Sequence, residues 1–201
     1  MNKFEVVSDF GEYKRAFLEQ NEKLNLISKK EEQFLYEKHI FDSIAIKLFF
    51  EKYKIEQARI LDIGCGGGFP CVPIAIEFPK MSVTGVDSIR KKINSVNEIK
   101  EKLNIGNLDL ICSRAENLKD KYDIVLSRAV AELGKIIEYG FPLLQDKGYF
   151  VAYKSKKALA EIDSAKNILK RFDAKVVDII EYTLPLEEIY ERNLIVIKRN
   201  N

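Results

Sequence analysis

The sequence predicts an α/β protein with one mostly parallel sheet, preceded by a helical segment. Strand and helix patterns alternate from Arg59 to Phe172, whereas the residues before Arg59 contain no strand candidate. The last two strand patterns follow each other without a helix between them. Alternating strands and helices indicate a parallel sheet covered by helices on both faces. The closing pair indicates a hairpin, so we expect the last strand to run antiparallel to the others.

The N-terminal segment, residues 1–57, reads as helical throughout. Phe10, Tyr13 and Phe17 fall on one helical face. Ser28 and Glu31 have the spacing of a capping box. An apolar stretch over residues 44–50 follows. We expect this segment to be an extension packed on an α/β core, residues 58–201, within a single domain spanning 1–201.

The core contains seven strand patterns and four helix patterns. The predicted strands cover residues 59–63, 82–86, 108–112, 122–126, 148–153, 175–182 and 193–198. The predicted helices cover residues 89–103, 130–144 and 157–172, together with one that Pro70 opens. The connection over residues 183–192 is too short for a crossover helix, which supports the hairpin.

Composition limits the classes of protein to consider. With 46% hydrophobic and 32% charged residues, the chain has the profile of a globular domain, and no apolar run reaches membrane-spanning length. The N-terminus lacks the layout of a signal peptide, so we expect a cytoplasmic protein. One histidine, and three cysteines without C-x-x-C spacing, predict no metal site.

The loop LDIGCGGGFP, residues 61–70, places four glycines after a strand pattern and suggests a ligand close to the backbone. A dinucleotide fingerprint would read G-x-G-x-x-G. Gly64 and Gly66 match it, but Phe69 stands at the third position and Pro70 follows, where the helix should meet a phosphate. The bulky pair Phe69-Pro70 therefore argues against a dinucleotide as the ligand. It argues equally against the hypothesis that the chain is a non-catalytic nucleotide-binding module.

S-adenosylmethionine (SAM) carries no phosphate and suits the acids of this region better. Asp62 ends the first strand, where it suits either the cationic ammonium end of SAM or the N–H groups of the loop itself. Asp87 ends the second strand, where it can accept hydrogen bonds from both ribose hydroxyls. The loop combined with an acid after the second strand is a moderately specific signal of SAM binding.

Several stretches in the same order resemble the bacterial RsmG/GidB family. They include "EKHIFDSI", "LDIGCGGGFPCVPIAIEFP", "YDIVLSRAVAEL" and "RNLIVIKR", and the resemblance covers nearly the whole chain. That family consists of SAM-dependent enzymes that methylate N7 of a guanine in 16S rRNA. The resemblance implies a Rossmann-like SAM-dependent methyltransferase fold, with a mostly parallel seven-stranded sheet and an antiparallel last strand.

The resemblance also implies roles for individual residues. With Asp62, the cofactor-binding residues would be Gly64, Gly66, Phe69, Asp87, Ala115, Glu116 and Arg128. The catalytic residues would be Arg128, His39 and Lys154. The sequence leaves open whether Arg128 contacts SAM or guanine O6. It also leaves open whether His39 is a buried structural residue or one that contacts RNA or orients the base.

The chemistry at N7 fits a site without an obvious general base. Guanine N7 already has a free lone pair, so no proton must leave during methyl transfer. The segment after the fourth strand reads Ser127-Arg128-Ala129 and lacks the Asp/Asn-Pro-Pro-aromatic motif of enzymes that methylate exocyclic amines. A pyrimidine carbon would need a cysteine nucleophile, but Pro70-Cys71 belongs to the SAM loop, on the wrong side of the site.

The substrate partner inferred here is 16S rRNA or the small ribosomal subunit, bound by a monomer. Net charge is only +2, so RNA would have to bind through local clusters. Candidates are Lys29-Lys30, residues 90–92 and residues 154–157. The alternative is a SAM-dependent methyltransferase of a small molecule or a protein, because fold does not fix the substrate.

Overall fold

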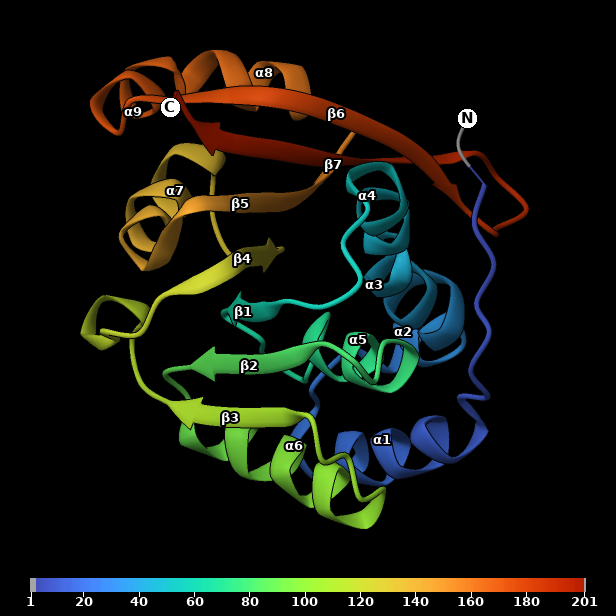
Figure 1. The fold of residues 1–201 in the computed structure, drawn as a ribbon. Coiled ribbons are helices and arrows are strands. Elements are labelled where there is room, and N and C mark those ends of the chain that lie inside the picture. Colours follow the sequence, from blue (N-terminus) through green and yellow to red (C-terminus); the bar gives the residue numbers. More distant parts are fainter. Residues whose placement is uncertain (1–2, 201) are drawn as a thin grey trace.

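The computed structural model describes residues 3–200 and contains one seven-stranded sheet. The strands are β1 (Arg59–Ile63), β2 (Ser82–Asp87), β3 (Leu108–Cys112), β4 (Tyr122–Arg128), β5 (Leu144–Ser155), β6 (Ala174–Leu184) and β7 (Tyr190–Arg199). Their order in the sheet is β3-β2-β1-β4-β5-β7-β6, which Figure 1 shows from bottom to top. All seven predicted strands are present, and β1 and β3 have the predicted bounds.

The direction of the strands confirms the predicted topology. β1 pairs in parallel with β2 and β4, β2 with β3, and β4 with β5. β7 inserts between β5 and β6 and runs antiparallel to both. The strand order reverses between β1 and β4. In open α/β sheets the ligand binds beside such a reversal, at the carboxyl ends of the strands.

Helices cover both faces of the sheet (Figure 1). On one face lie α1 (Gly11–Leu24), α4 (Ile46–Tyr53), α5 (Cys71–Glu77) and α6 (Arg90–Lys102). On the other lie α7 (Leu133–Gly140), α8 (Ala158–Ser164) and α9 (Lys166–Arg171). The 3₁₀ turns η2 (Ala115–Asn117) and η3 (Phe141–Leu143) connect strands and helices on the way. None of the helices within residues 3–200 is long and apolar enough to cross a membrane.

Alternation along the strands produces two separate cores. Ile60 of β1 faces the core that contains Phe17 and Phe49 of the N-terminal helices. Its neighbour Leu61 faces the core that contains Ile136 of α7. Successive side chains of a strand point to opposite faces, so each central strand contributes to both cores. The N-terminal helices therefore share one continuous core with the sheet.

The N-terminal segment contains an element that the sequence pattern did not predict. After the short α2 (Lys29–Glu32), residues Leu35–Phe41 form a π-helix, η1, followed directly by α3 (Asp42–Ile44). π-Helical turns are rare and occur frequently at functional sites. The predicted capping box does not form: the Ser28 hydroxyl bonds the Glu31 carboxylate at 3.1 Å, and neither side chain caps a backbone N–H of α2.

Several other boundaries differ from the prediction. The helix predicted from residue 130 begins at Leu133, because Ala129 has a positive φ of 57° that ends β4 in a turn. β5 begins at Leu144, where it pairs with Tyr122 across a register shift. The single helix predicted over residues 157–172 is divided into α8 and α9 at Ala165.

Candidate functional site

A cleft of about 390 Å³ opens at the carboxyl ends of β1, β2 and β3, beside the reversal of strand order. We call it the carboxyl-edge cleft. It is lined by Ile63, Gly64, Val86, Asp87, Ser88, Ile89, Ser113, Arg114, Ala115, Glu116, Val130 and Tyr139. Four of the predicted cofactor residues, Gly64, Asp87, Ala115 and Glu116, therefore meet in one cavity although they come from three different connections.

The glycine loop forms the wall of this cleft nearest β1. Gly64 has a φ of 72°, and its N–H donates to the carbonyl of Val86 at 2.8 Å. A Cβ at this position would lie 2.6 Å from Cγ2 of Val130, whose side chain also lines the cleft. Glycine is therefore required both by the left-handed backbone and by the close approach of the β4–α7 connection.

Asp87 connects the loop to the end of β2. Its Oδ2 accepts a hydrogen bond from the N–H of Gly66 at 3.0 Å, and its Oδ1 accepts one from the N–H of Ile89 at 2.8 Å. A carboxylate offers about four lone-pair sites, so each oxygen can still accept another donor. Asp87 thus closes its own turn and also presents acceptors to the cleft.

Ala115 and Glu116 lie in η2, directly after β3. Ala115 is buried, and Glu116 is exposed. Both line the carboxyl-edge cleft on the side opposite the glycine loop, together with Tyr139 of α7. The cleft therefore carries carboxylates at two of its edges, and Arg114 is the only basic residue among those that line it.

Asp62 does not line the cleft but lies beneath the glycine loop, fully buried. Its Oδ2 accepts a hydrogen bond from the N–H of Cys71, the first residue of α5, at 3.1 Å, whereas its Oδ1 has no hydrogen-bond partner. Burial raises the pKa of Asp62 to about 7, despite the hydrogen bond from Cys71. Because a carboxylate of the chain itself occupies the start of α5, a pyrophosphate has no helix terminus to bind there.

Phe69 is buried and does not line the cleft. Its ring centroid lies 5.0 Å from that of Phe17 and 5.0 Å from that of His39, and the guanidinium carbon of Arg128 lies 5.4 Å from it. It therefore anchors the loop against α1 and η1, and the structure brings it together with His39 and Arg128 rather than with Asp87.

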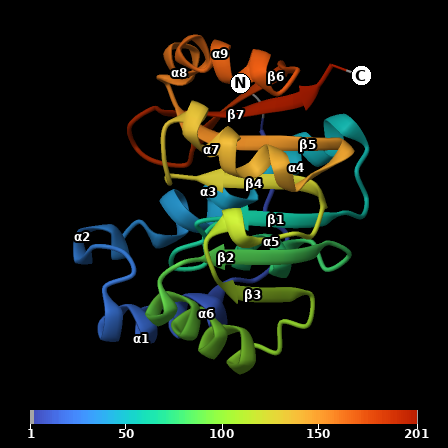
Figure 2. The same cartoon turned by 90° about the vertical axis from the view of Figure 1, so that its left-hand side faces the viewer.

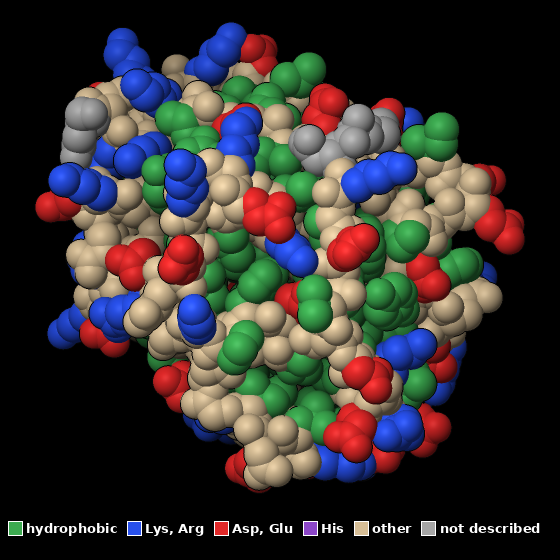
Figure 3. All heavy atoms as spheres, turned by 45° about the vertical axis from the view of Figure 1, so that its right-hand side comes forward, with side chains coloured by type: hydrophobic (Ala, Val, Ile, Leu, Met, Phe, Trp, Pro, Cys, Tyr) green, Lys and Arg blue, Asp and Glu red, His purple; other side chains and the backbone are tan. Residues whose placement is uncertain are grey.

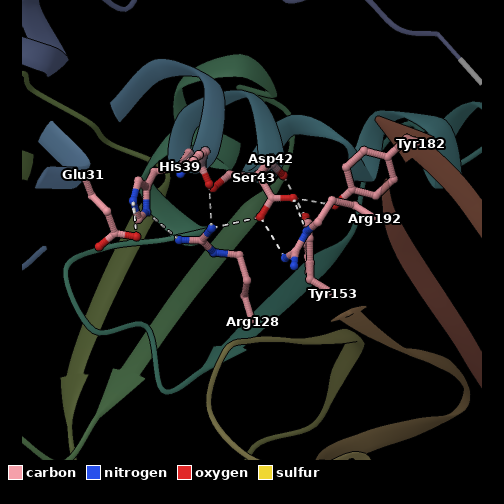
Figure 4. A network of polar contacts seen from close by, with 9 residues as sticks. Glu31, His39, Asp42, Ser43, Arg128, Tyr153, Tyr182 and Arg192 are labelled. Atoms are coloured by element: carbon pink, nitrogen blue, oxygen red, sulfur yellow. Dashed lines mark hydrogen bonds and ion pairs between the residues drawn. The ribbon is translucent and has the colours of Figure 1, made fainter. Parts of the chain in front are cut away.

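Arg128, at the end of β4, is held by residues of the N-terminal segment (Figure 4). Its Nη1 donates to Oδ2 of Asp42 at 2.9 Å and to the carbonyl of Lys38 at 3.1 Å. Its Nη2 lies 3.1 Å from Nδ1 of His39. The side chain is only 11% exposed. The predicted catalytic pair, His39 and Arg128, therefore forms one contact, outside the residues that line the carboxyl-edge cleft.

Asp42 joins a second arginine to this group. Arg192 of β7 donates from Nε and Nη2 to the two oxygens of Asp42, each at 3.1 Å, and the hydroxyl of Tyr182 donates to Oδ1 at 2.6 Å. Burial alone would raise the pKa of Asp42, but the positive charges of Arg192 and Arg128 outweigh it and hold the pKa below its usual range. We call His39, Asp42, Arg128, Tyr182 and Arg192 the Arg128 network.

The Arg128 network determines which ring nitrogen of His39 carries a proton and whether the ring is charged. An arginine can only donate, so Nδ1 of His39 must accept, and the neutral ring then carries its proton on Nε2. Burial, reinforced by the charge of Arg128, lowers the pKa of His39 to about 4. Nε2 lies 3.9 Å from Oε1 of Glu31 and has no hydrogen-bond partner among the described residues. His39 is therefore neutral at physiological pH and offers an N–H donor.

Lys154 lies apart from both groups. Its Nζ donates to the carbonyl of Ala131 at 2.8 Å and pairs with Oε2 of Glu161 at 2.6 Å, and its side chain is only 12% exposed. The same Oε2 accepts from the N–H of Leu133 at 3.1 Å. Lys154 thus supports the β4–α7 connection, which borders the cleft through Val130. Lys156 and Lys157 beside it are exposed.

Sequence reasoning missed Arg192 and Tyr182, because no local pattern links them to Asp42, which lies at least 140 residues earlier. It also missed Ile89, Val130 and Tyr139 as residues of the cleft. Within residues 3–200, no three His, Cys, Asp or Glu side chains are grouped so that they could hold a metal ion.

Comparisons with known proteins agree on one family. The family model described as rRNA small subunit methyltransferase G, GidB, matches residues 7–190. A protein of Staphylococcus saprophyticus named ribosomal RNA small subunit methyltransferase G is 39% identical over 197 residues, which cover 96% of this chain and 81% of that protein. A protein of the same name from Bacillus pumilus is 39% identical over 199 residues, covering 96% and 82%.

Solved structures agree on the fold. TYW2 of M. jannaschii in complex with AdoMet matches with a TM-score of 0.60 at 16% identity, over 79% of this chain and 76% of that one. Coclaurine N-methyltransferase, bound to N-methylheliamine and SAH, matches with a TM-score of 0.57 at 11% identity, over 79% and 70%. At such low identity these likenesses concern the fold alone, which is that of SAM-dependent methyltransferases.

Proposed function

Since the chain belongs to the GidB family of small-subunit rRNA methyltransferases, we propose that it transfers the methyl group of SAM to N7 of a guanine in 16S rRNA. The observation that carries this proposal is the carboxyl-edge cleft, which gathers Gly64, Asp87 and Glu116 beside the reversal of strand order. Carboxylates line the cleft, and Asp62 occupies the start of α5 beside the loop, so the cleft suits a cation better than a phosphate.

The residues of the cleft fit the chemical groups of SAM. Asp87 retains lone pairs that can accept from ribose hydroxyls, and Glu116 can accept from the adenine amino group. Oδ1 of Asp62 has no hydrogen-bond partner among the described residues. Its negative charge would attract the cationic end of SAM across the glycine loop. When bound, SAM supplies an electrophilic methyl group on a sulfonium.

The Arg128 network supports a reaction without a general base. Nδ1 of His39 is engaged by Arg128, and Nε2 carries a proton, so the imidazole has no free lone pair to take up a proton. Guanine N7 needs no proton removed. We infer that His39 and Arg128 act as donors that orient the base or the carboxylate end of the cofactor, and that Asp42 and Arg192 position Arg128.

Exposed basic residues around the carboxyl edge support RNA as the substrate. Lys29 and Lys30 lie on α2, which projects at the left of Figure 2, and Arg90 and Lys91 open α6 after β2. Lys156 and Lys157 follow β5. Figure 3 shows another face, on which Lys and Arg side chains gather at the upper left and acidic and basic side chains are mixed elsewhere. Lys154 is excluded as a phosphate contact by its pairing with Glu161.

We further propose that the chain works as a monomeric single domain in the cytoplasm, without a metal ion. The shared core of the sheet and the N-terminal helices supports the single domain, because Phe17 and Phe49 pack in the same cluster as Ile60 and Val83. A ribosomal RNA substrate supports the proposed cytoplasmic location. An enzyme that methylates a small molecule or a protein would not need the exposed basic residues at the carboxyl edge of the sheet.

One experiment separates these substrates. Methyl-labelled SAM is offered to the protein with naked 16S rRNA, with assembled small subunits and with a metabolite extract, and the modified atom is mapped. We expect label at N7 of a single guanine in one of the two ribosomal samples, and none with Asp87→Ala. Label only in the metabolite extract or in protein would refute the RNA proposal. Label at another atom of the RNA would refute the assignment to N7 but not RNA as the substrate.

A further inference from the structure

A second hollow lies between η1 and the β6–β7 turn, apart from the residues that line the carboxyl-edge cleft. Its volume is about 490 Å³. It is lined by Gln33, Phe34, Glu37, Lys38, Pro185, Leu186, Glu187, Glu188 and Tyr190. We call it the Phe34–Tyr190 groove. None of these residues lines the carboxyl-edge cleft, and the backbone carbonyl of Lys38 accepts a hydrogen bond from Arg128 of the Arg128 network.

The charge of the groove is opposite to that expected of an RNA surface. Glu37, Glu187 and Glu188 contribute three carboxylates, against the single ammonium of Lys38. Glu187 and Glu188 are exposed at the rim. One oxygen of Glu37, Oε2, is buried and has no hydrogen-bond partner among the described residues, whereas the side chain as a whole is partly exposed and lines the groove. A phosphate backbone would be repelled here, whereas a cation would be attracted.

The groove also offers aromatic and apolar surface at which a cation with an aliphatic stem could pack. Nζ of Lys38 already lies 4.4 Å from the centroid of the Phe34 ring, so the chain itself places a cation against this wall. Tyr190 is 45% exposed and Ile189, beside it in the turn, is 81% exposed. Exposed apolar side chains next to a carboxylate rim are typical of a surface that binds a peptide rather than a single ion.

We propose that the Phe34–Tyr190 groove binds a basic peptide segment of a partner protein, with an arginine or lysine side chain entering between Phe34 and Tyr190. The carboxylates of Glu37, Glu187 and Glu188 neutralise its charge, and the exposed apolar side chains of the β6–β7 turn cover its backbone. The groove shares no lining residue with the carboxyl-edge cleft. Peptide binding in the groove can therefore be tested whether or not guanine N7 is the methyl acceptor.

The test uses the full chain and defined probes. A fluorescent dodecapeptide containing four arginines among leucine and glycine is titrated with the protein, and anisotropy gives the Kd. The same peptide with citrulline in place of arginine keeps the shape and loses the charge. A single-stranded RNA of similar length serves as the competing class of ligand. Each titration is repeated at two salt concentrations, because contacts between exposed charges weaken with salt.

Variants locate the binding site. The triple variant Glu37→Gln, Glu187→Gln, Glu188→Gln should weaken arginine-peptide binding by about two- to fivefold per carboxylate, the range of exposed ion pairs. Tyr190→Ser should weaken it independently of salt. The matched control Glu22→Gln, Glu101→Gln, Asp120→Asn makes the same change in net charge at exposed positions outside the groove and should leave the Kd unchanged.

Three outcomes would overturn the proposal. The first is equal affinity for the arginine and citrulline peptides. The second is equal weakening in the groove variant and in the matched control, which would indicate a diffuse effect of net charge. The third is RNA that binds the wild-type protein and loses affinity in Tyr190→Ser, while the arginine peptide is indifferent to that substitution. That result would assign the groove to stacked bases.

Discussion

Substitutions of His39 separate a histidine that orients from a histidine that acts as a base. His39→Asn retains an acceptor near the position of Nδ1, so it can still receive the hydrogen bond from Nη2 of Arg128. His39→Ala removes that acceptor. Neither variant can act as a general base, so a catalytic base would be lost in both, whereas the acceptor that holds Arg128 in place would be lost only in His39→Ala.

The pKa of His39 fixes the expected pH profile. Burial and the charge of Arg128 lower this pKa to about 4. A base with an ordinary histidine pKa of about 6.5 changes from roughly 10% to roughly 90% deprotonated between pH 5.5 and 7.5, which raises a rate about tenfold. A group with a pKa near 4 changes by only a few per cent over the same interval. We therefore expect the wild-type rate to be nearly flat.

The assay is a single turnover with saturating SAM and labelled 16S rRNA, followed from pH 5.5 to 7.5. We expect His39→Asn to keep the flat profile and to lose no more than about tenfold in rate. His39→Ala should lose more, because a hydrogen bond to a charged group contributes about 1.5–3 kcal/mol and Arg128 would be less well oriented. The Tm of each variant is the control for loss of folding.

A wild-type rate that climbs about tenfold with pH, and a loss of 10²–10⁴ in both variants, would refute this reasoning. That result would mean that Nδ1 or Nε2 takes up a proton during the reaction. The nucleophile would then be a hydroxyl or an amine rather than N7.

Four other results are expected. Asp87→Ala should weaken SAM binding by about 1.5–3 kcal/mol in calorimetry, and NAD should not bind more tightly than SAM to the wild type. Asp62→Asn should stabilise the free protein at pH 8 by a few kcal/mol and leave stability at pH 4 almost unchanged. The raised folded-state pKa of about 7 makes wild-type stability fall as pH rises from about 4 to 7, and urea unfolding at the two pH values measures the difference. Lys156→Ala with Lys157→Ala should lower the slope of log affinity for RNA against log salt by about 0.7–0.9 per lost phosphate contact, and an unchanged slope would show that they are only solvated. Asp42→Asn should destabilise the fold by about 3–5 kcal/mol in the same unfolding assay, because two buried guanidiniums lose their carboxylate.

The sheet could be predicted from the sequence because its signals are local. Residues such as Ile60 and Leu61 alternate between two cores, and the first two strand patterns end before Gly64 and at Asp87. The cleft residues Gly64 and Asp87 were predictable for the same reason, since each lies where a strand pattern ends, whereas Glu116 was indicated only by the family resemblance. Parallel strands bring their carboxyl ends to one edge whatever the details of packing.

The Arg128 network could not be predicted, because its contacts are tertiary. Nothing near Asp42 in the sequence indicates that Arg192 will share its carboxylate, and no periodicity distinguishes the π-helix that presents His39 from an α-helix. The sequence also could not show that Lys154 differs from its neighbours in the cluster 154–157. Beside two exposed lysines it resembles part of a basic cluster, and only the position of α8 shows that Glu161 neutralises it.

The sharing of Asp42 between two arginines has a consequence for the order in which the protein matures. During synthesis the N-terminal helices leave the ribosome first and β7 leaves last. Asp42 and Arg128 exist long before Arg192, but the carboxylate is fully paired only when β7 inserts between β5 and β6. A nascent chain that stops before β7 would contain every residue of the carboxyl-edge cleft and still lack the arrangement that fixes Arg128. Completion of the Arg128 network therefore depends on β7, the strand that is synthesised last.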